Sequence, residues 1–380
     1  MIIGVLKEPS PETRVSLLPE HVTILQKWKV AAMIENDAGI KAFATDENYT
    51  AAGATTGSRE EIIKAADIIL AINQPQIDTS LIRSKVLLGV YQPLFNHSLM
   101  EAFAREGVTV FSIDMIPRTT RAQSMDVLSS QANIAGYKAV LMAANIFPKY
   151  FPMFMTAAGS IPPAKMLILG AGVAGLQAIA TGRRLGAVVE VFDTRPAVKE
   201  EVMSLGAKFV EVEGAADAAR AGGYAVEQTT EFMQRQKAKI AEHVAKADII
   251  ITTAQIPGKK APVLITKPMI EAMKNGSVII DLAAATGGNT QLTKNEETMV
   301  HNGVSIVGNS RLAATMPSDA SKLYGKNILN FIELIIDKEG ALNLNFEDDL
   351  VKGTCIVHEG LITNDKVQAI VEEELHAKQP

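Results

Sequence analysis

The stretch that decides the fold of this chain is KMLILGAGVAGLQAIATGRRLGAVVEVFD, residues 165–193. A short apolar run typical of a buried strand leads into the glycine sextet GAGVAG at 170–175, and a segment with apolar residues at helical spacing follows it. A second apolar run then ends in Asp193. Glycine-rich sextets are frequent by chance, but strand, glycine turn, helix and acid-ended strand in this order are typical of a dinucleotide-binding β-α-β unit.

The residues of the sextet have separate physical roles in such a unit. Gly170 permits a tight turn, Gly172 lets backbone N–H groups approach a pyrophosphate, and Gly175 lets the helix lie close to the sheet. The helix that begins near Val173 would point its amino terminus at that pyrophosphate. The alternative is a glycine-rich turn that binds no ligand, and the flanking pattern disfavours it.

Asp193 indicates which dinucleotide is bound. An acidic side chain at the end of the second strand accepts hydrogen bonds from the adenosine ribose hydroxyls and repels a 2′-phosphate, so it favours NAD(H) over NADP(H). Arg195 argues in the other direction, because a nearby arginine can tolerate the phosphate. Thr194 lies between these two residues and is a further candidate for cofactor contact. We expect NAD(H).

Length and composition exclude several classes of function. At 380 residues the chain is long enough for two domains. Its 42 acidic and 37 basic residues nearly balance, which disfavours nucleic acid as a partner. The single cysteine, Cys355, cannot form an internal disulfide, and the start MIIGVLKEPS resembles a strand more than a signal sequence, so we expect a cytoplasmic chain. The uncharged run 166–182 is shorter than the about 20 residues of a membrane helix.

Short apolar runs alternate with amphipathic stretches along the chain, as expected for β-α-β units. This pattern predicts an α/β fold of two doubly wound, Rossmann-like domains, joined by long helices at 128–147 and from 318. Residues 129–317 should form the dinucleotide-binding domain. Residues 1–128 and 318–380 should together form a discontinuous first domain, because the part after the second long helix is too short for a domain of its own.

The histidines do not suggest an acid or a base. A dehydrogenase that oxidises an alcohol or an amine needs a positioned histidine or lysine to accept a proton. The histidines fall in segments with the pattern of exposed helices or turns, and we expect them to be solvated: His21, His97, His243, His301, His358 and His376. No spacing of ligands suggests a metal. Hydride exchange between two nicotinamide rings needs no base, only rings held about 3 to 3.5 Å apart.

Several motifs resemble one family over nearly the whole chain. They are RAQSMDVLSSQ at 121–131 with the following AGY, the glycine fingerprint itself, GGYA at 222–225, ITTAQIPGKKAPVLIT at 251–266 and SVIIDLAAATGGN at 277–289. Together they resemble the NAD(H)-binding component of the proton-translocating NAD(P)+ transhydrogenases. In that family the polar loop lies beside the nicotinamide and faces NADP(H) on a partner, which implies carboxamide and ribose ligands at Arg118, Gln123, Asp126 and Ser129. The alternative is a polar helix cap without a ligand.

The resemblance also implies further cofactor contacts. By the resemblance, residues 213–231, EGAADAARAGGYAVEQTTE, form a mobile loop that closes over the bound nucleotide, with Tyr224 as its latch and Gly223 as a cofactor contact. Composition alone would favour a tolerated surface insertion there. Gln236 in the following helix and Gln255 at the end of a strand are weaker candidates for cofactor contact.

Alanine dehydrogenase is a relative of this family and supplies the main alternative. It shares the opening pattern present here as KEPSPETRV at 7–15, which includes Arg14. Its substrate lysine and catalytic histidine should fall near Asn73 and Gln92, and a catalytic aspartate should fall at Ala285, so none is retained. Amino-acid oxidation is therefore disfavoured. The transhydrogenase pattern often has an acid at this position, so Ala285 departs from that pattern as well. A non-catalytic NAD sensor is the third possibility.

The transhydrogenase resemblance implies a place in an assembly. NADH bound by this chain would pass hydride directly to NADP+ on a beta subunit, while other subunits couple the reaction to proton translocation. The implied partners are the remaining alpha polypeptide and the NADP(H)-binding beta subunit, which would place the chain peripherally on the inner membrane. A homodimer is also implied, and the segment KKAPVLITKPM at 259–269 is a candidate contact for it.

Overall fold

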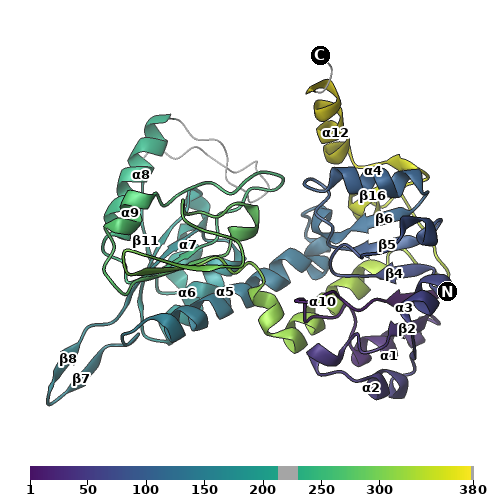
Figure 1. The fold of residues 1–380 in the computed structure, drawn as a ribbon, viewed down its shortest axis with the longest axis horizontal. Helices are drawn as coiled ribbons and strands as arrows, with labels where there is room; N and C mark the ends of the chain where they lie inside the picture. The colour runs from purple at the N-terminus through teal and green to yellow at the C-terminus, as the bar shows by residue number, and fades with distance from the viewer. Residues whose placement is uncertain (213–229, 378–380) are drawn as a thin grey trace. The chain divides into compact units, whose positions relative to one another are not determined.

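The computed structural model describes residues 1–212 and 230–377 and divides the chain into two compact units (Figure 1). Unit 1 contains Met1–Gln131 and Ala314–Pro380, and unit 2 contains Ala132–Ala313. Each unit is built on a largely parallel sheet, so the α/β class predicted from the sequence is confirmed.

Unit 1 contains an eight-stranded sheet with the order β17-β16-β6-β5-β4-β1-β2-β3. The strands from β1 to β6 run parallel to their neighbours, and β16 and β17 add antiparallel strands at one edge. The strands are β1 (Ile2–Val5), β2 (Ala31–Glu35), β3 (Thr55–Gly57), β4 (Ile68–Leu70), β5 (Val86–Gly89), β6 (Thr109–Ser112), β16 (Cys355–His358) and β17 (Leu361–Ile362). The carboxy-terminal part of the chain therefore completes a sheet begun at the amino terminus.

Both faces of this sheet are buried. Ile68 and Leu70 belong to one core cluster together with Ile328 of α10, whereas Ile69 between them belongs to a second cluster with Phe103 of α4. Since successive side chains point to opposite faces, a strand buried on both faces has a continuous apolar sequence. The helices are α1 (Pro19–Lys27), α2 (Asp46–Ala51), α3 (Arg59–Ala65), α4 (His97–Arg105), α10 (Pro317–Ile332), α11 (Asp349–Thr354) and α12 (Asp365–Ala377).

Unit 2 contains a seven-stranded sheet with the order β11-β10-β9-β12-β13-β15-β14, in which only β14 is antiparallel. The strands are β9 (Lys165–Leu169), β10 (Val188–Phe192), β11 (Lys208–Phe209), β12 (Ile249–Thr252), β13 (Val278–Asp281), β14 (Thr298–His301) and β15 (Val304–Val307). From β9 the chain proceeds outward to β10 and β11, then returns to β12 on the other side. This reversal creates a topological switch point, and ligands of such sheets bind beyond the carboxyl ends of the strands there.

The helices of unit 2 are α6 (Val173–Arg184), α7 (Lys199–Ser204), α8 (Thr230–Val244) and α9 (Lys267–Glu271), and most of α5 (Val127–Ile146). Within the described parts of the chain, no helix combines the length and apolar character needed to cross a bilayer.

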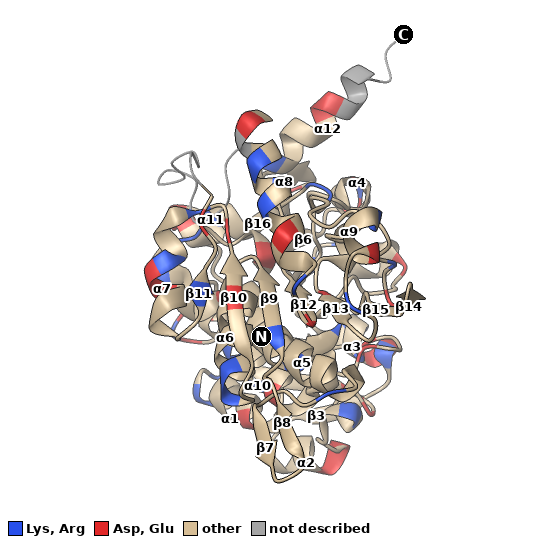
Figure 2. Cartoon of the chain, turned by 90° about the vertical axis from the view of Figure 1, so that its left-hand side faces the viewer, with Lys and Arg blue, Asp and Glu red and all other residues tan. Residues whose placement is uncertain are grey.

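A hairpin of β7 (Phe154–Thr156) and β8 (Gly159–Ile161) lies between α5 and β9. It projects from the rest of its unit (Figure 1), and all six strand residues are exposed. Figure 2 shows no Lys, Arg, Asp or Glu on it, whereas charges of both signs are scattered over the other elements. The sequence patterns did not indicate these two strands.

Candidate functional site

The glycine fingerprint forms a turn at the switch point of unit 2. Gly170 follows β9 directly, and its φ of +107° would be strained for a residue with a Cβ. A Cβ on Gly175 would lie 2.0 Å from the carbonyl oxygen of Gly170, so α6 can rest on this turn only because Gly175 has none. A Cβ on Gly172, by contrast, would meet nothing within 4 Å. The turn is therefore open at Gly172 and closed at the other two glycines.

The amino terminus of α6 has unpaired donors. Its N-cap, Gly172, has no side chain to accept the first N–H groups of the helix, which begins at Val173. Such N–H groups and the positive end of the helix dipole attract an anion. The turn and helix start therefore fit a pyrophosphate, as the sequence predicts.

Asp193 follows β10 directly and is held beside the turn. Its Oδ2 accepts the backbone N–H of Ala171 at 2.7 Å, and its side chain is 6% exposed. Arg195 donates to the same carboxylate from Nε at 2.9 Å and from Nη2 at 2.7 Å. The guanidinium is therefore bound to Asp193, which favours the NAD(H) expectation. Thr194 lies between them and is half-buried.

The loops after β12 and β13 are tied to this turn by residues that the sequence analysis did not select. Thr253 donates from Oγ1 to the carbonyl of Gly170 at 3.1 Å. Asn289, fully buried, accepts the N–H of Ala254 at 3.0 Å and donates back to its carbonyl at 2.8 Å. Asp281 in turn accepts the N–H of Asn289 at 2.7 Å. In the sequence, an acid at the end of the strand-like run SVIID, Asp281, was the signal that could have indicated this network.

The other predicted residues of unit 2 lie as follows. Gln255 is exposed at the carboxyl edge and donates from Nε2 to the carbonyl of Leu282 at 3.1 Å. Gln236 is partly exposed within α8. Gly223 and Tyr224 lie outside the described residues. Ala285 is exposed in a short 3-10 turn, Ala284–Thr286.

The polar loop belongs to unit 1. It forms a 3-10 turn, Arg121–Met125, that leads into α5. Asp126 accepts hydrogen bonds from the backbone N–H of Ser129 at 2.9 Å and from its Oγ at 2.6 Å, so these two residues cap the helix together. The cap explains part of the polar composition of this stretch.

Three of the predicted ligands line one pocket. Arg118, Gln123 and Asp126 lie in the wall of a cavity of about 290 Å³ in unit 1. Asp114 lines the same pocket and was not selected from the sequence, although it ends the strand-like run VTVFSID. Burial raises the pKa of Asp114, and a 2.5 Å hydrogen bond from Ser112 Oγ partly offsets that effect. Ser129 is positioned by Asp126 rather than by the pocket wall.

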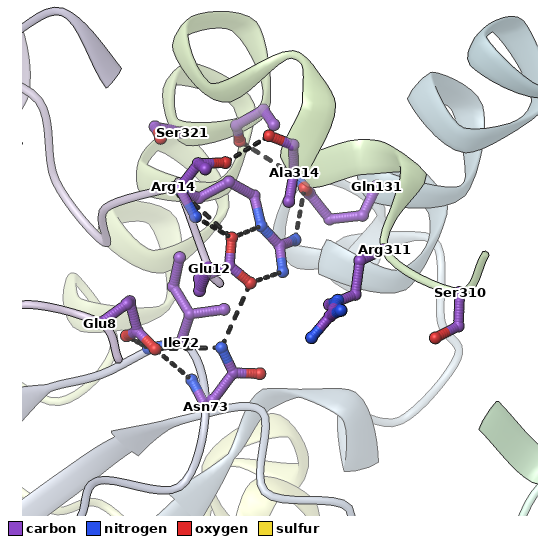
Figure 3. Close-up of polar contacts among 12 residues, drawn as sticks. Glu8, Glu12, Arg14, Ile72, Asn73, Gln131, Ser310, Arg311, Ala314 and Ser321 are labelled. Atoms are coloured by element: carbon purple, nitrogen blue, oxygen red, sulfur yellow. Dashed lines mark hydrogen bonds and ion pairs between the residues drawn. The ribbon is translucent and has the colours of Figure 1, made fainter. Parts of the chain in front are cut away.

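Arg14 belongs to a buried ionic cluster in unit 1 (Figure 3). Glu12 accepts from Arg14 Nε at 2.8 Å and from Nη2 at 2.7 Å, and Gln131 accepts from Nη1 at 2.9 Å. Burial opposes ionisation of Glu12, but Arg14 outweighs it and lowers the pKa of Glu12 to about 2. Asn73 donates from Nδ2 to Glu8 at 3.0 Å. Glu12 therefore neutralises the Arg14 guanidinium within the cluster.

The expectation that the histidines are solvated is wrong for two of them. His21 is 3% exposed, its Nδ1 accepts the N–H of Leu18 at 2.9 Å, and burial lowers its pKa. The His243 side chain is 10% exposed and its Nδ1 lies 2.6 Å from Glu190 Oε2. Tertiary contacts bury these rings, which the sequence pattern of each helix alone did not indicate. The side chain of His376 lies outside the described residues.

The strand order, the glycine turn at the switch point and the acid after the second strand define unit 2 as a Rossmann-type dinucleotide-binding domain. The family models for the alanine dehydrogenase/PNT N-terminal and C-terminal domains match residues 4–135 and 139–365. The chain belongs to the alanine dehydrogenase/PNT family, in its transhydrogenase alpha-subunit branch.

Relatives from both branches are known. The chain is 44% identical to an NAD(P) transhydrogenase alpha-subunit polypeptide of Rhodospirillum rubrum, over 96% of this chain and 98% of that protein. It is 25% identical to the alanine dehydrogenase of Staphylococcus haemolyticus, over 89% and 88% of the two chains. A crystal structure of transhydrogenase from Sinorhizobium meliloti matches with a TM-score of 0.87 and 44% identity, covering 95% of this chain and all of that one. These matches confirm the resemblance found in the motifs.

Proposed function

We propose that this chain binds NADH at the fingerprint of unit 2 and passes hydride directly to NADP+ held by a partner subunit. The observation that carries the proposal is the pairing of an NAD-type fingerprint with a pocket lined by Arg118, Gln123 and Asp126, in a transhydrogenase alpha-subunit relative. The chain is accordingly an oxidoreductase component.

The chemistry balances without an acid or a base. The hydrogen leaves C4 of NADH with its electron pair and bonds to C4 of NADP+, so NADH becomes NAD+ and NADP+ becomes NADPH. No heteroatom gains or loses a proton. What the protein supplies is position, with the two C4 atoms about 3 to 3.5 Å apart. In the proposal Arg118, Gln123, Asp126 and Ser129 hold carboxamide and ribose groups, and Gln123 reaches towards the second nucleotide.

The proposal selects NAD(H) for this chain because an acid, Asp193, follows the second strand, and because its ion pair engages the Arg195 guanidinium that could otherwise bind a 2′-phosphate. The first N–H groups of α6 would bind the pyrophosphate. Gly223, Tyr224, Gln236 and Gln255 remain proposed contacts taken from the family pattern.

The relatives support a proposal that this chain has partner subunits. The Rhodospirillum protein is named as one portion of an alpha subunit, and the alpha subunit of Cereibacter sphaeroides extends beyond the matched region, since this chain covers 69% of it. The proposal therefore includes a remaining alpha polypeptide and a beta subunit that binds NADP(H). Proton translocation belongs to those partners, which would hold this chain at the inner membrane.

We also propose a homodimer that uses the β7-β8 hairpin. An isolated two-stranded hairpin is marginally stable in water, and this one exposes Met153, Phe154 and Met155. A second copy would cover these side chains. The change Met155→Asp should yield monomers in sedimentation equilibrium, whereas the control Phe43→Asp, at an 82% exposed side chain of unit 1, should not. Dimers that survive Met155→Asp would contradict the hairpin contact.

A stopped-flow mixture tests the function. The chain is mixed with a beta-type NADP(H) domain, NADH and an analogue of NADP+, and the analogue's reduction is followed. We expect transfer in the mixture and none when either protein is omitted. NADH binding without transfer would make the chain a sensor, and reduction of NAD+ by alanine without any partner would make it an alanine dehydrogenase.

A further inference from the structure

The polar loop contains two long hydrogen bonds beside one of ordinary length, from the N–H of Ala122 to the carbonyl of Thr119 at 3.1 Å. Within it the N–H of Gln123 lies 3.4 Å from the carbonyl of Thr120, and the N–H of Asp126 lies 3.4 Å from the carbonyl of Gln123. Both distances lie beyond the usual range for N–H···O bonds, and a 3-10 turn has poor hydrogen-bond geometry in any case. Ala122 and Met125 are buried, which anchors one face of the turn. The backbone between them needs further support from outside.

Helix α10 gives the first support. Asn327 and Asn330 lie one turn apart on the same face of this helix, and both donate from Nδ2 to the carbonyl oxygen of Ser124, at 2.7 Å and 2.8 Å. Asn327 is 9% exposed, and its Oδ1 is buried with no hydrogen-bond partner among the described residues. Burying an amide with an unpaired oxygen is costly, so donation to Ser124 is the favourable hydrogen bond that this side chain makes there.

The start of α11 gives the second support. Arg121 donates from Nη1 to Asp348 Oδ2 at 2.8 Å, and it also bonds Asp349. Asp348 is itself fixed, because its Oδ1 accepts the N–H of Leu350 at 2.8 Å as the N-cap of α11. The planar guanidinium can bond both carboxylates at once, which a lysine cannot do in the same geometry.

We propose that Arg121, Asn327 and Asn330 are positioning residues, which hold the loop 118–126 rigid so that Gln123 is presented to the second nucleotide. This inference rests on the proposed function. A misplacement of about 1 Å between reacting groups can cost on the order of 100-fold in rate, so contacts that fix the position of the loop matter for transfer. None of the three residues lines the pocket.

The test uses the full-length chain and two readouts. Hydrogen exchange of the peptide 118–131 is measured on the chain alone, and single-turnover hydride transfer is measured with the beta-type domain. The variants are Arg121→Gln, Arg121→Lys and Asn330→Asp, which keeps the shape of the side chain and removes the donor. Arg83→Gln is the matched control, because Arg83 is an exposed arginine of unit 1 whose ion-pair partner, Glu106, lies outside the loop.

We expect Arg121→Gln and Asn330→Asp to accelerate exchange in the loop about tenfold and to slow transfer about tenfold, with NADH affinity within about twofold of wild type. Arg121→Lys should give exchange and transfer rates between those of Arg121→Gln and wild type, and Arg83→Gln should match wild type in both. Unchanged exchange, or slower transfer that follows weaker NADH binding, would overturn the inference. If the wild-type mixture transfers nothing, the proposed function fails. Faster exchange of the loop in the variants would then show only that these residues anchor the loop structurally.

Discussion

At the scale of the residue, a change at Gln123 distinguishes an effect on hydride transfer from an effect on cofactor binding. It is exposed on the loop and lines the pocket with Arg118 and Asp126. Shortening it by one methylene with Gln123→Asn should slow hydride transfer by about 10- to 100-fold and change NADH affinity little, because in the proposed function Gln123 contacts the second nucleotide. Calorimetry and single-turnover kinetics measure the two quantities. Weaker NADH binding with an unchanged transfer rate would show that Gln123 does not contact the second nucleotide.

Glu8 makes a prediction about pH and stability. Burial raises the pKa of Glu8 from 4.5 to about 7, despite the donors on Asn73 and Ile72. The folded state therefore holds a proton that the unfolded state releases near pH 4.5, so this contribution to stability is complete below that pH. It is lost as pH rises through about 7, and amounts to about 3 kcal/mol at most. Glu12 stays ionised throughout this window.

The variant Glu8→Gln isolates this effect, since a glutamine does not titrate. The difference in unfolding free energy between wild type and variant, from urea titrations, should shift in favour of the variant between pH 5 and pH 8. A difference that stays constant with pH would show that Glu8 does not bind a proton in this range.

At the scale of the element, the turn between β9 and α6 yields a matched pair of variants. Gly172→Ala adds a methyl to open space, so the free energy of unfolding should change by less than about 0.5 kcal/mol. That methyl stands where N–H groups approach the pyrophosphate, so NADH affinity should fall at least tenfold. Gly175→Ala drives its methyl against the Gly170 carbonyl and should destabilise the chain by about 1–3 kcal/mol. Normal NADH affinity in Gly172→Ala would refute the site.

The elements also show which parts of the fold the sequence patterns could predict. The strands that run through the core were predictable because parallel strands buried on both faces need apolar runs, as at 68–70 and 278–281. The β7-β8 hairpin was missed because its strands are three residues long, exposed and bounded by prolines. β16 and β17 were missed for a related reason. β16 pairs with β6 and β17 pairs with β16, so the sheet joins segments more than 240 residues apart, which no local pattern encodes.

The site shows the same limit. The fingerprint and Asp193 were found because their spacing along the chain is itself the signal. Asp114, Asn327 and Asp348 act through contacts that only folding creates, so neither composition nor periodicity marked them. The Glu12–Arg14 pair is an intermediate case, because its partners are near in sequence while its burial is not visible there.

At the scale of the whole molecule, the chain holds an NAD-type site in one unit and a polar pocket in the other, within a family whose other branch oxidises alanine by name. Amino-acid oxidation and transhydrogenation differ in whether a proton is exchanged with the protein or the solvent. An amino-acid dehydrogenase exchanges a proton with an acid or base, whereas direct transfer between rings keeps the hydrogen out of water throughout.

Isotope labelling therefore tests the central claim most directly. NADH that carries deuterium at both C4 positions is mixed with this chain, the NADP(H)-binding subunit and NADP+ in ordinary water, and the NADPH formed is analysed by mass spectrometry. We predict one deuterium at C4 of every NADPH. NADPH that carries hydrogen from the solvent at C4 would contradict direct transfer.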